Sequence, residues 1–530
     1  MKVTNYSNDA NEIRLIKYHK KGLLRLIFSR LGLIIVLLAF QIAIFVTLML
    51  WLAAGFKYYT ILMGVFTTIM VFYLYNCDMD SSAKLTWMII IAIFPIPGAL
   101  FLAFTQVEIG HRALKRRMLF IMSATRHSLK QDKEVIHELI EDANGQEDLH
   151  RYINRTGCFP IYKNSEVTFF PWGQDKFDAL MEEVEKAEKF IFLEYFIIEE
   201  GYMWGRLLKL LAEKAKQGVD VRVLYDGMCE MQLLPHNYTK RLAEYGIKAR
   251  TFSTIHPFVS TYYNYRDHRK VLVVDGKVAF NGGVNLADEY INKVEKFGVW
   301  KDTAVMVKGD AVKAYTLMFL QMWSADDREL HIDEYLNLPI DNSQFKDAKG
   351  YVMPYSDIPL DDEKVGENVY MDVINRADKY VHIMTPYLIL DDELKNAIRY
   401  AAERGVEVDI ILPGIPDKKM AFALAKTHYA YLLKAGVNIY EYTPGFVHAK
   451  VFTSDDTKAI VGTINLDYRS LYHHFECATY MYKVDAVSDI EEDYQNTLKE
   501  CHKITLEDVK HEKIFYKLAG GVVKLVAPLM

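Results

Sequence analysis

The chain has 530 residues, of which 51% are hydrophobic and 25% are charged, and its formal net charge is -6. This composition excludes a disordered chain, a collagen-like fibre and a disulfide-rich scaffold. The acidic balance disfavours nucleic acid as a partner, because proteins that bind duplex DNA usually carry a basic excess. The five cysteines form no CxxC pair, so we expect unpaired thiols and no zinc site.

Three apolar stretches follow one another near the N-terminus: residues 31–54, 58–76 and 85–104, the last interrupted at Pro95. A helix needs about 20 apolar residues to cross a bilayer. Residues 31–104 therefore predict a membrane region with two or three transmembrane helices. A buried helix of a soluble protein is the alternative, and three such stretches in close succession disfavour it.

Basic side chains flank this region on both sides, in residues 1–30 and again in residues 111–133. The positive-inside rule asks for both flanks to be cytoplasmic, which three full spans do not allow. Either one stretch fails to span or one flank departs from the rule. We interpret residues 1–30 as a basic N-terminal segment and residues 105–150 as a basic linker helix at the membrane surface. An ordinary solvated linker is the alternative for the latter.

From about residue 151 the chain is soluble in character and repeats itself. KQGVDVRVLYDG (216–227) and ERGVEVDIILPG (403–414) each follow a helical pattern and place a glycine, Gly218 or Gly405, just past the helix end. The apolar runs after these glycines predict buried strands. Alternating helices and strands predict an α/β fold with mixed sheets.

This repeat divides the rest of the chain into two similar lobes. We expect the first lobe over residues 151–335, a linker over 336–350, the second lobe over 351–510 and an amphipathic C-terminal segment over 511–530.

A motif with the spacing HxKx4D occurs once in each lobe, at a constant offset, and an asparagine follows it both times. The residues are His268, Lys270, Asp275 and Asn285 in the first lobe, and His448, Lys450, Asp455 and Asn465 in the second. The aliphatic run after each histidine predicts a strand, on which side chains two positions apart share a face. The pair Asp275–Gly276 predicts a hairpin turn that brings the asparagine back beside the histidine. Two facing lobes would then surround one point with imidazoles, ammonium groups and amides. Such a set binds an anionic phosphoryl group and supplies a nucleophile and a proton carrier without a metal or cofactor.

These motifs resemble those of the phospholipase D superfamily, and most closely those of the bacterial cardiolipin synthases. The resemblance is carried by NYRDHRKVLVVDGKVAFNGGVNLADEYI (264–291), WKD (300–302), TPY (385–387), PGFVHAK (444–450) and GTINLDYRSLYHHFE (462–476). It implies two phospholipase D-like α/β lobes with mixed sheets that face each other, preceded by transmembrane helices. It also implies a multi-pass protein of the bacterial cell membrane, and we expect its catalytic part on the cytoplasmic side.

The resemblance further implies roles for the motif residues. His268 would attack phosphorus and form a phosphohistidine, and His448 would protonate the leaving alcohol, although the sequence itself is symmetric on this point. The lysines and asparagines of both motifs would bind the non-bridging oxygens. Asp275 and Asp455 belong to the family motif, with hairpin-turn formation as the alternative. Glu476 would orient the imidazole in its lobe, and Asp302 would do so in the first lobe. His473 and His474 lack the motif and are expected to be incidental.

The implied reaction transfers the phosphatidyl group of one phosphatidylglycerol to another and releases glycerol. The partners would be phosphatidylglycerol, other anionic phospholipids and the bilayer, with oligomerisation left open. A phospholipase D-type hydrolase, or a phosphatidyltransferase that uses a small alcohol, is the alternative. A nuclease is disfavoured by the net charge, and a catalytically silent lipid-binding protein by the two intact motifs.

Overall fold

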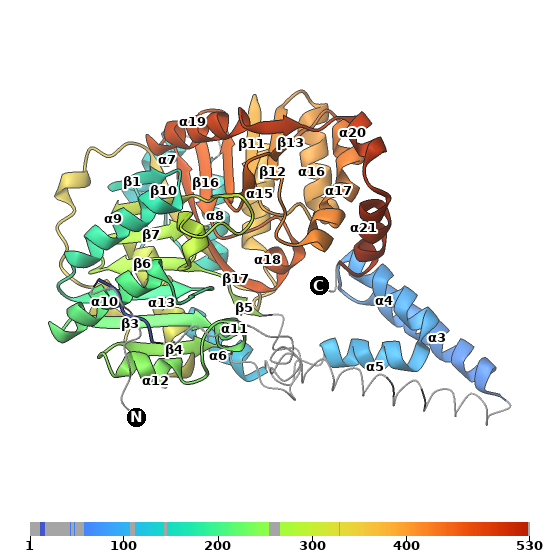
Figure 1. Cartoon of the computed structure of the whole chain (residues 1–530), viewed down its shortest axis with the longest axis horizontal. Coiled ribbons are helices and arrows are strands. Elements are labelled where there is room, and N and C mark those ends of the chain that lie inside the picture. The colour runs from blue at the N-terminus through green and yellow to red at the C-terminus, as the bar shows by residue number, and fades with distance from the viewer. Residues whose placement is uncertain are drawn as a thin grey trace. The chain divides into compact units, whose positions relative to one another are not determined.

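The computed structural model describes residues 11–15, 43, 47, 58–106, 112–142, 146–253, 265–327 and 329–527 (Figure 1). These residues fall into two compact units. The larger unit holds residues 11–15 and the described residues from 114 to 521, and the smaller unit holds the remainder. Nearly all of the predicted stretch 31–54 lies outside the described residues, so its membrane span stays a prediction.

The described residues of the smaller unit include α3 (Tyr59–Asn76), α4 (Ser81–Ile93) and α5 (Pro95–Gln106). The interruption in the third apolar stretch is a helix break, because Pro95 opens α5 at the position where its missing N–H costs no hydrogen bond. Within the ranges described, no helix is both long enough and apolar enough to span a bilayer, whereas two or three were expected over residues 31–104.

Residues 105–150 were expected to form one basic helix at the membrane surface; the structure shows several helices in place of one, and the location at the membrane surface stays a prediction. The described part of the segment forms α6 (Arg112–Thr125), α7 (Lys133–Asp142) and the start of α8 (Gln146–Gly157). Met118 and Ile121 of α6 are buried in the core of the larger unit. The apolar residues between the basic ones therefore pack inward and join this segment to the lobes.

The larger unit contains two mixed sheets, which confirms the predicted α/β class. The first has the order β1-β9-β7-β6-β2-β3-β4. Its strands are β1 (Ser165–Phe170), β2 (Phe190–Tyr195), β3 (Asp220–Asp226), β4 (Lys248–Phe252), β6 (Lys270–Val274), β7 (Val278–Gly282) and β9 (Ala304–Gly309). The second has the order β10-β17-β16-β15-β11-β12-β13-β18. Its strands are β10 (Tyr351–Asp357), β11 (Tyr380–Met384), β12 (Glu407–Pro413), β13 (Asn438–Tyr442), β15 (Val451–Ser454), β16 (Lys458–Gly462), β17 (His474–Tyr482) and β18 (Cys501–Lys503).

Helices cover these sheets and connect their parallel strands. They are α9 (Gly173–Glu185), α10 (Tyr202–Lys216), α11 (Gly227–Gln232), α12 (Tyr238–Ala243), α13 (Val312–Trp323), α14 (Asp333–Leu336), α15 (Val365–Asn375), α16 (Asp392–Glu403), α17 (Lys419–Lys434), α18 (Tyr468–Tyr472), α19 (Ala486–Leu498), α20 (Leu506–His511) and α21 (Ile514–Val526). Gly218 and Gly405 follow α10 and α16 with φ of 95° and 98°, so both predicted helix ends are confirmed.

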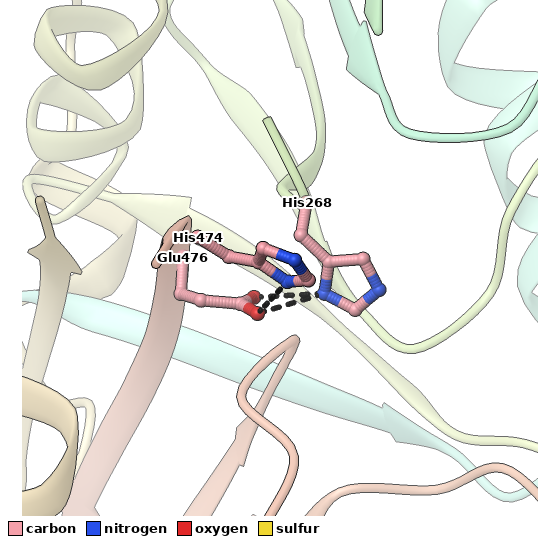
Figure 2. A group of neighbouring side chains, drawn as sticks. All are labelled: His268, His474 and Glu476. Carbon is pink, nitrogen blue, oxygen red and sulfur yellow. Dashed lines mark hydrogen bonds and ion pairs between the residues drawn. The ribbon is translucent and has the colours of Figure 1, made fainter. Parts of the chain in front are cut away.

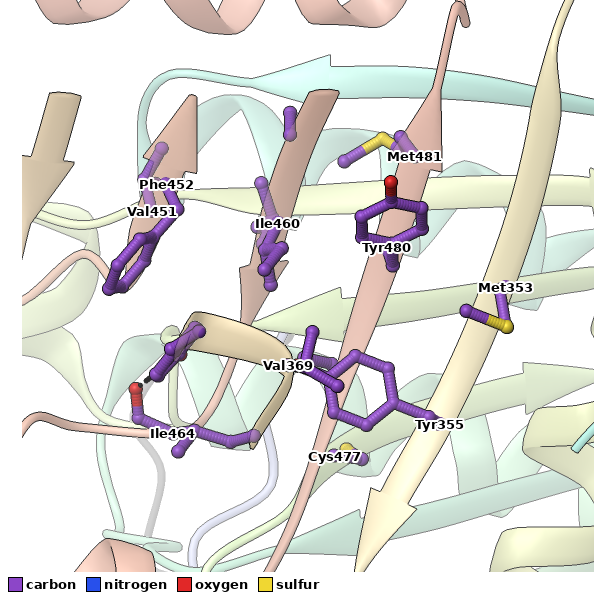
Figure 3. Close-up of a cluster of buried hydrophobic side chains, with 14 of the residues drawn as sticks. Met353, Tyr355, Val369, Val451, Phe452, Ile460, Ile464, Cys477, Tyr480 and Met481 are labelled. Atoms are coloured by element: carbon purple, nitrogen blue, oxygen red, sulfur yellow. Dashed lines mark hydrogen bonds between the residues drawn. The ribbon is translucent and has the colours of Figure 1, made fainter. Parts of the chain in front are cut away.

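The core is continuous across the two lobes. Every residue of α13 except Lys313 is buried, because this helix packs between strands of the first sheet and β10 of the second. In the second lobe, side chains from β10, β15, β16 and β17 pack with Val369 of α15 (Figure 3). Burial on both faces explains why these strands are apolar along their length instead of alternating.

Two short parallel strand pairs cross between the lobes. β5 (Arg266–Asp267) pairs with His474–Phe475 at the start of β17, and β14 (Gly445–Val447) pairs with β8 (Val299–Lys301). Each pair stands directly before a motif histidine, so each histidine is fixed by the opposite lobe.

The motif aspartates lie in the hairpin turns that follow β6 and β15. Asp275 has a left-handed φ of 53°, followed by Gly276 at 68°, and these two residues are the centre of a tight turn closed by the Lys277 N–H, which donates to Val274 O at 2.9 Å. The carboxylate of Asp275 accepts backbone N–H groups at 2.7–2.8 Å from three successive residues, Glu188, Lys189 and Phe190. Asp455 does the same for residues 378–380. The oxygens of both carboxylates thus hold the entry to β2 and β11, as the hairpin-turn alternative predicts, and a catalytic part for Asp275 and Asp455 stays a prediction.

Replacement of Asp275 by alanine should destabilise the first lobe by about 2–4 kcal/mol, since three backbone donors lose a charged acceptor. Asp275→Asn, which keeps one acceptor oxygen and tolerates the left-handed backbone, should cost less. Urea unfolding of the full chain measures both, with the exposed Asp178→Ala as the control. Equal midpoints for Asp275→Ala and Asp178→Ala would contradict this role.

Candidate active site

The two motif histidines occupy equivalent places in the two lobes. His268 lies between β5 and β6, and its backbone N–H donates to Phe475 O of the second lobe at 2.9 Å. His448 lies between β14 and β15, and its N–H donates to Lys301 O of the first lobe at 2.7 Å. Both side chains are buried. The lysine two positions on in each motif donates to the carbonyl oxygen of its own histidine.

Each imidazole is paired with a carboxylate from the other lobe. His268 Nδ1 lies 2.8 and 3.0 Å from the two oxygens of Glu476, and His448 Nδ1 lies 2.7 Å from Asp302 Oδ2. Both carboxylates were expected to serve their own lobes, so that pairing was wrong. The crossed strand pairs are the reason, because Glu476 follows the segment that pairs with β5, and Asp302 follows β8. Since a carboxylate only accepts, Nδ1 carries the proton and Nε2 presents a lone pair.

The carboxylate of Glu476 is held from several sides. Thr463 Oγ1 donates to one of its oxygens, and Ser470 Oγ donates to the other at 2.6 Å. Figure 2 shows His268 and His474 both turned toward this carboxylate, with His474 Nδ1 at 3.6 Å. His474 therefore belongs to the site, although it was expected to be incidental.

The surroundings of Asp302 differ from those of Glu476. A Cβ on Gly283 would meet Asp302 Oδ1 at 2.0 Å, so only glycine fits where the second motif has Thr463. The ring of His448 lies 5.4 Å from Tyr290 and 5.6 Å from Trp300. Burial in this aromatic environment raises the pKa of Asp302 to about 7. The two His–carboxylate pairs are thus chemically unequal in spite of their matching motifs.

The two motif asparagines occupy equivalent, buried positions in the two lobes, but their hydrogen-bond partners differ. Asn285 Oδ1 accepts the N–H of Ile197 at 3.0 Å, and its Nδ2 donates to the hydroxyl of Tyr290 at 2.8 Å. Asn465 Oδ1 has no hydrogen-bond partner in the part of the chain that the structure describes. Asn285 thus positions the tyrosine beside His448, and phosphate binding by either amide stays a prediction.

The charges of both motifs act on one another, so they form one site. Burial, and next the ammonium groups of Lys270 and Lys450, hold the pKa of His268 well below its usual range. Burial and the same two lysines lower the pKa of His448. Burial also lowers the pKa of Lys270 to about 7 and that of Lys450 to about 8. A bound anion would oppose these shifts and favour the charged lysines.

Lys418 is a further cation of the site that the sequence analysis missed. Its charge lowers the pKa of both histidines, and its Nζ stands 4.9 Å from the ring centre of Tyr387. Tyr387 in turn donates to Asp417 at 2.7 Å. The position of Lys418 in the loop after β12 could have indicated it, since ligands of α/β sheets bind at the carboxyl ends of parallel strands.

His268, His474 and Glu476 each place a possible ligand atom within 4.8 Å of the others. Both Glu476 oxygens already accept hydroxyl donors, and His268 Nδ1 donates to the same carboxylate. The group therefore fits the orientation of a reactive imidazole better than a metal centre. Together the site offers two unprotonated Nε2 atoms and three lysines, a set suited to nucleophilic attack on a phosphodiester.

Comparison with known proteins agrees with this geometry. Residues 180–323 and 370–498 match the family described as "Cardiolipin synthase, PLD-like domain". An uncharacterized protein of Streptococcus mutans is 57% identical over 87% of this chain and 99% of its own. A cardiolipin synthase of Alkalihalophilus pseudofirmus is 33% identical over 84% of this chain and 88% of its own. The crystal structure of a phosphatidylserine synthase from Haemophilus influenzae covers 72% of this chain and 97% of its own with a TM-score of 0.53 at 16% identity, which shows the fold alone.

The lowered pKa of His268 predicts a pH dependence of stability. Below about pH 6.5 the unfolded chain binds a proton at this imidazole and the folded chain does not, so the free energy of unfolding falls as the pH decreases. His268→Gln should make this dependence shallower by up to about 1.4 kcal/mol per pH unit. Urea unfolding between about pH 5 and 7 tests this, with the exposed His502→Gln as the control. A His268→Gln slope equal to that of the unchanged chain would contradict a neutral buried ring.

Proposed function

The chain belongs to the cardiolipin synthases with phospholipase D-like domains, and we propose that it transfers the phosphatidyl group from one phosphatidylglycerol to another, giving cardiolipin and glycerol. The observation that carries the proposal is the pair of buried imidazoles, each oriented through Nδ1 by a carboxylate of the opposite lobe. One imidazole attacks phosphorus and the other exchanges a proton with the alcohol.

We assign His268 as the nucleophile and His448 as the acid and base. Both oxygens of Glu476 contact His268 Nδ1, which fixes the ring and increases the electron density at Nε2. The bound anionic diester first favours the protonated form of His448. In the first step Nε2 of His268 then bonds to phosphorus, and the bond to the glycerol oxygen breaks as protonated His448 gives that oxygen its Nε2 proton. In the second step His448 takes the proton from a hydroxyl of the second phosphatidylglycerol, whose oxygen displaces His268. Atoms and charges balance, and no nucleotide is consumed.

The lysines bind the non-bridging oxygens in this proposal. Lys270 and Lys450 are buried, so their charge is weakly screened when the site is occupied. The developing negative charge on phosphorus favours their protonated forms, and that interaction is stronger in the transition state than with the free diester. Lys418 would meet the lipid head group as it approaches, from the loop that precedes α17.

The lipid bilayer is the proposed location of both substrates. In the smaller unit, the outward side chains of α3 include Ile61, Val65 and Ile69, all exposed. In the larger unit, Ile514, Phe515 and Leu518 of α21 are also exposed, beside Lys517. Apolar side chains flanked by lysines suit the interface of an anionic membrane. We infer association with the bacterial cell membrane, with the catalytic lobes on the cytoplasmic side as the basic flanks predict.

Purified protein given phosphatidylglycerol with a labelled glycerol head group should release glycerol and form cardiolipin without a CDP-activated lipid. His268→Ala and His448→Ala should each lower the rate by a factor on the order of 10³ or more, since each removes one partner of a two-step transfer. Mass spectrometry of the lipids measures cardiolipin, and the label in the aqueous phase measures the released glycerol. Phosphatidic acid as the only product would favour the alternative, a hydrolase, and full activity in either variant would contradict the two-histidine mechanism.

Each motif histidine is paired with a carboxylate of the opposite lobe. This pairing predicts which variants recover activity when the donor lipid carries an activated leaving group. A phosphatidyl ester of p-nitrophenol releases an alcohol that needs no proton, so it bypasses the acid in the first step. Asp302→Asn and His448→Ala should both recover p-nitrophenol release with this donor, after losses of about 10²–10⁴ on phosphatidylglycerol. Glu476→Gln and His268→Ala should stay slow with both donors.

Two other outcomes would contradict this assignment. Recovery of His268→Ala but not His448→Ala would exchange the roles of the two histidines. Recovery of Glu476→Gln together with His448→Ala would show that each carboxylate serves its own lobe in solution. Asp178→Ala, at an exposed position of α9, serves as the control with unchanged rates on both donors.

A further inference from the structure

A second group of metal-ligating side chains lies on the sheet of the second lobe, on the face covered by α19. It consists of His382 on β11 and of Glu407 and Asp409 on β12. β11 and β12 run parallel with His382 opposite Asp409, and residues two apart on a strand share a face. One ligand atom from each of the three residues lies within 4.8 Å of the others. No motif in the sequence marks them, because they come from two separate strands.

The ring of His382 is oriented as a metal ligand would be. Its Nδ1 lies 2.8 Å from Glu491 Oε1, so the carboxylate places the proton on Nδ1 and leaves the lone pair on Nε2. The side chain of His382 is only 5% exposed, and its Nε2 has no hydrogen-bond partner among the residues described. Tyr380 and Tyr494 stack on the two faces of the ring, with centroids 4.2 and 4.6 Å away. The plane of the ring is therefore fixed, and an imidazole nitrogen is left unsatisfied in the interior.

The charge around this nitrogen is negative. Asp409 is 2% exposed, its Oδ1 accepts a bond from Asn438 Nδ2 at 2.7 Å, and its carboxylate also accepts the hydroxyl of Tyr440. In the described part of the chain, Glu491 contacts His382, and no lysine or arginine forms an ion pair with Glu407, Asp409 or Glu491. A buried carboxylate beside a second acidic side chain is costly without a compensating cation. The group thus combines an unused nitrogen donor with uncompensated negative charge.

We propose that His382 Nε2, Asp409 and Glu407 bind one divalent cation of the zinc class, with water in the remaining position. A nitrogen ligand with two carboxylates suits Zn²⁺, whereas Mg²⁺ and Ca²⁺ prefer oxygen alone. Ligand bonds of about 2.0 Å place tetrahedral ligands about 3.3 Å from one another, so atoms that lie within 4.8 Å of one another need at most a small inward movement of a side chain. Glu407 is the exposed member of the group, and it provides both that movement and the entry path.

The ion has a structural effect in this position. Glu491, which orients His382, lies on α19, and the same helix carries Asp493, which binds Lys301 Nζ at 2.6 Å. Lys301 ends β8 of the first lobe, next to Asp302. A cation on His382 strengthens its bond to Glu491, because the metal makes Nδ1–H a better donor. It therefore stabilises the helix that joins the two lobes, and it takes no part in the phosphatidyl transfer.

The test is metal binding by the full chain after removal of metal with a chelator. Calorimetric titration with Zn²⁺ should show one ion bound, Co²⁺ should give a visible absorption band of four-coordinate geometry, and Zn²⁺ should raise the Tm. Asp409→Asn and His382→Gln should abolish the Co²⁺ band and the Tm shift. Glu491→Gln should weaken binding about 10–100-fold, as expected when the residue behind a ligand is lost.

His268→Ala is the matched control, because His268, His474 and Glu476 form the other candidate metal-binding group of the described residues that contains histidine. Binding of Zn²⁺ should persist in this variant. Loss of binding in His268→Ala together with its persistence in Asp409→Asn would place the ion in the active site and overturn the proposal, as would the absence of saturable binding in the unchanged chain. If Asp409→Asn does not fold, Glu407→Gln at the exposed position replaces it, and unchanged Zn²⁺ affinity in that variant would equally contradict the site.

Discussion

The rest of the site depends on one constraint, namely the two short parallel strand pairs that join the lobes. β5 adds to the start of β17, and β8 pairs with β14, so the backbone of each lobe continues into the other immediately before a motif histidine. The buried guanidinium of Arg269 reinforces this connection, because it donates to Glu476 O and to Ser356 Oγ of the second lobe. Each imidazole can then meet only a carboxylate of the opposite lobe. Neither lobe by itself holds both a motif histidine and the carboxylate that orients it.

The two halves of the site are equal in sequence pattern and unequal in environment. Glu476 receives two hydroxyl donors, whereas Asp302 lies against glycine and beside the aromatic rings around His448. This difference suits the proposed transfer, in which one ring holds a covalent bond to phosphorus while the other moves a proton. The difference arises from the residues around each carboxylate, and the motif residues themselves do not show it.

Local sequence was sufficient to predict those features that depend on neighbouring residues. Gly218 and Gly405 marked helix ends, and Asp275–Gly276 marked a hairpin, because backbone conformation at these positions follows from the residue type. The pairing of Asp302 with His448 was not predictable, since it depends on which strand of the other lobe lies alongside. Lys418 and His474 were not predicted as site residues for the same reason, because tertiary packing brings them to the site. The basic residues of α6 concealed an apolar face whose burial only the folded lobes reveal.

The burial of α13 on all sides limits how this architecture changes over evolution. A helix without a solvent face accepts few substitutions, since a polar residue there loses its hydration and a smaller one leaves a cavity. The two halves must therefore diversify as one inherited block and not by recombination of separate modules. Connecting segments, such as the loop before α17, are where such a chain accepts new residues, because their replacement leaves the shared interior intact.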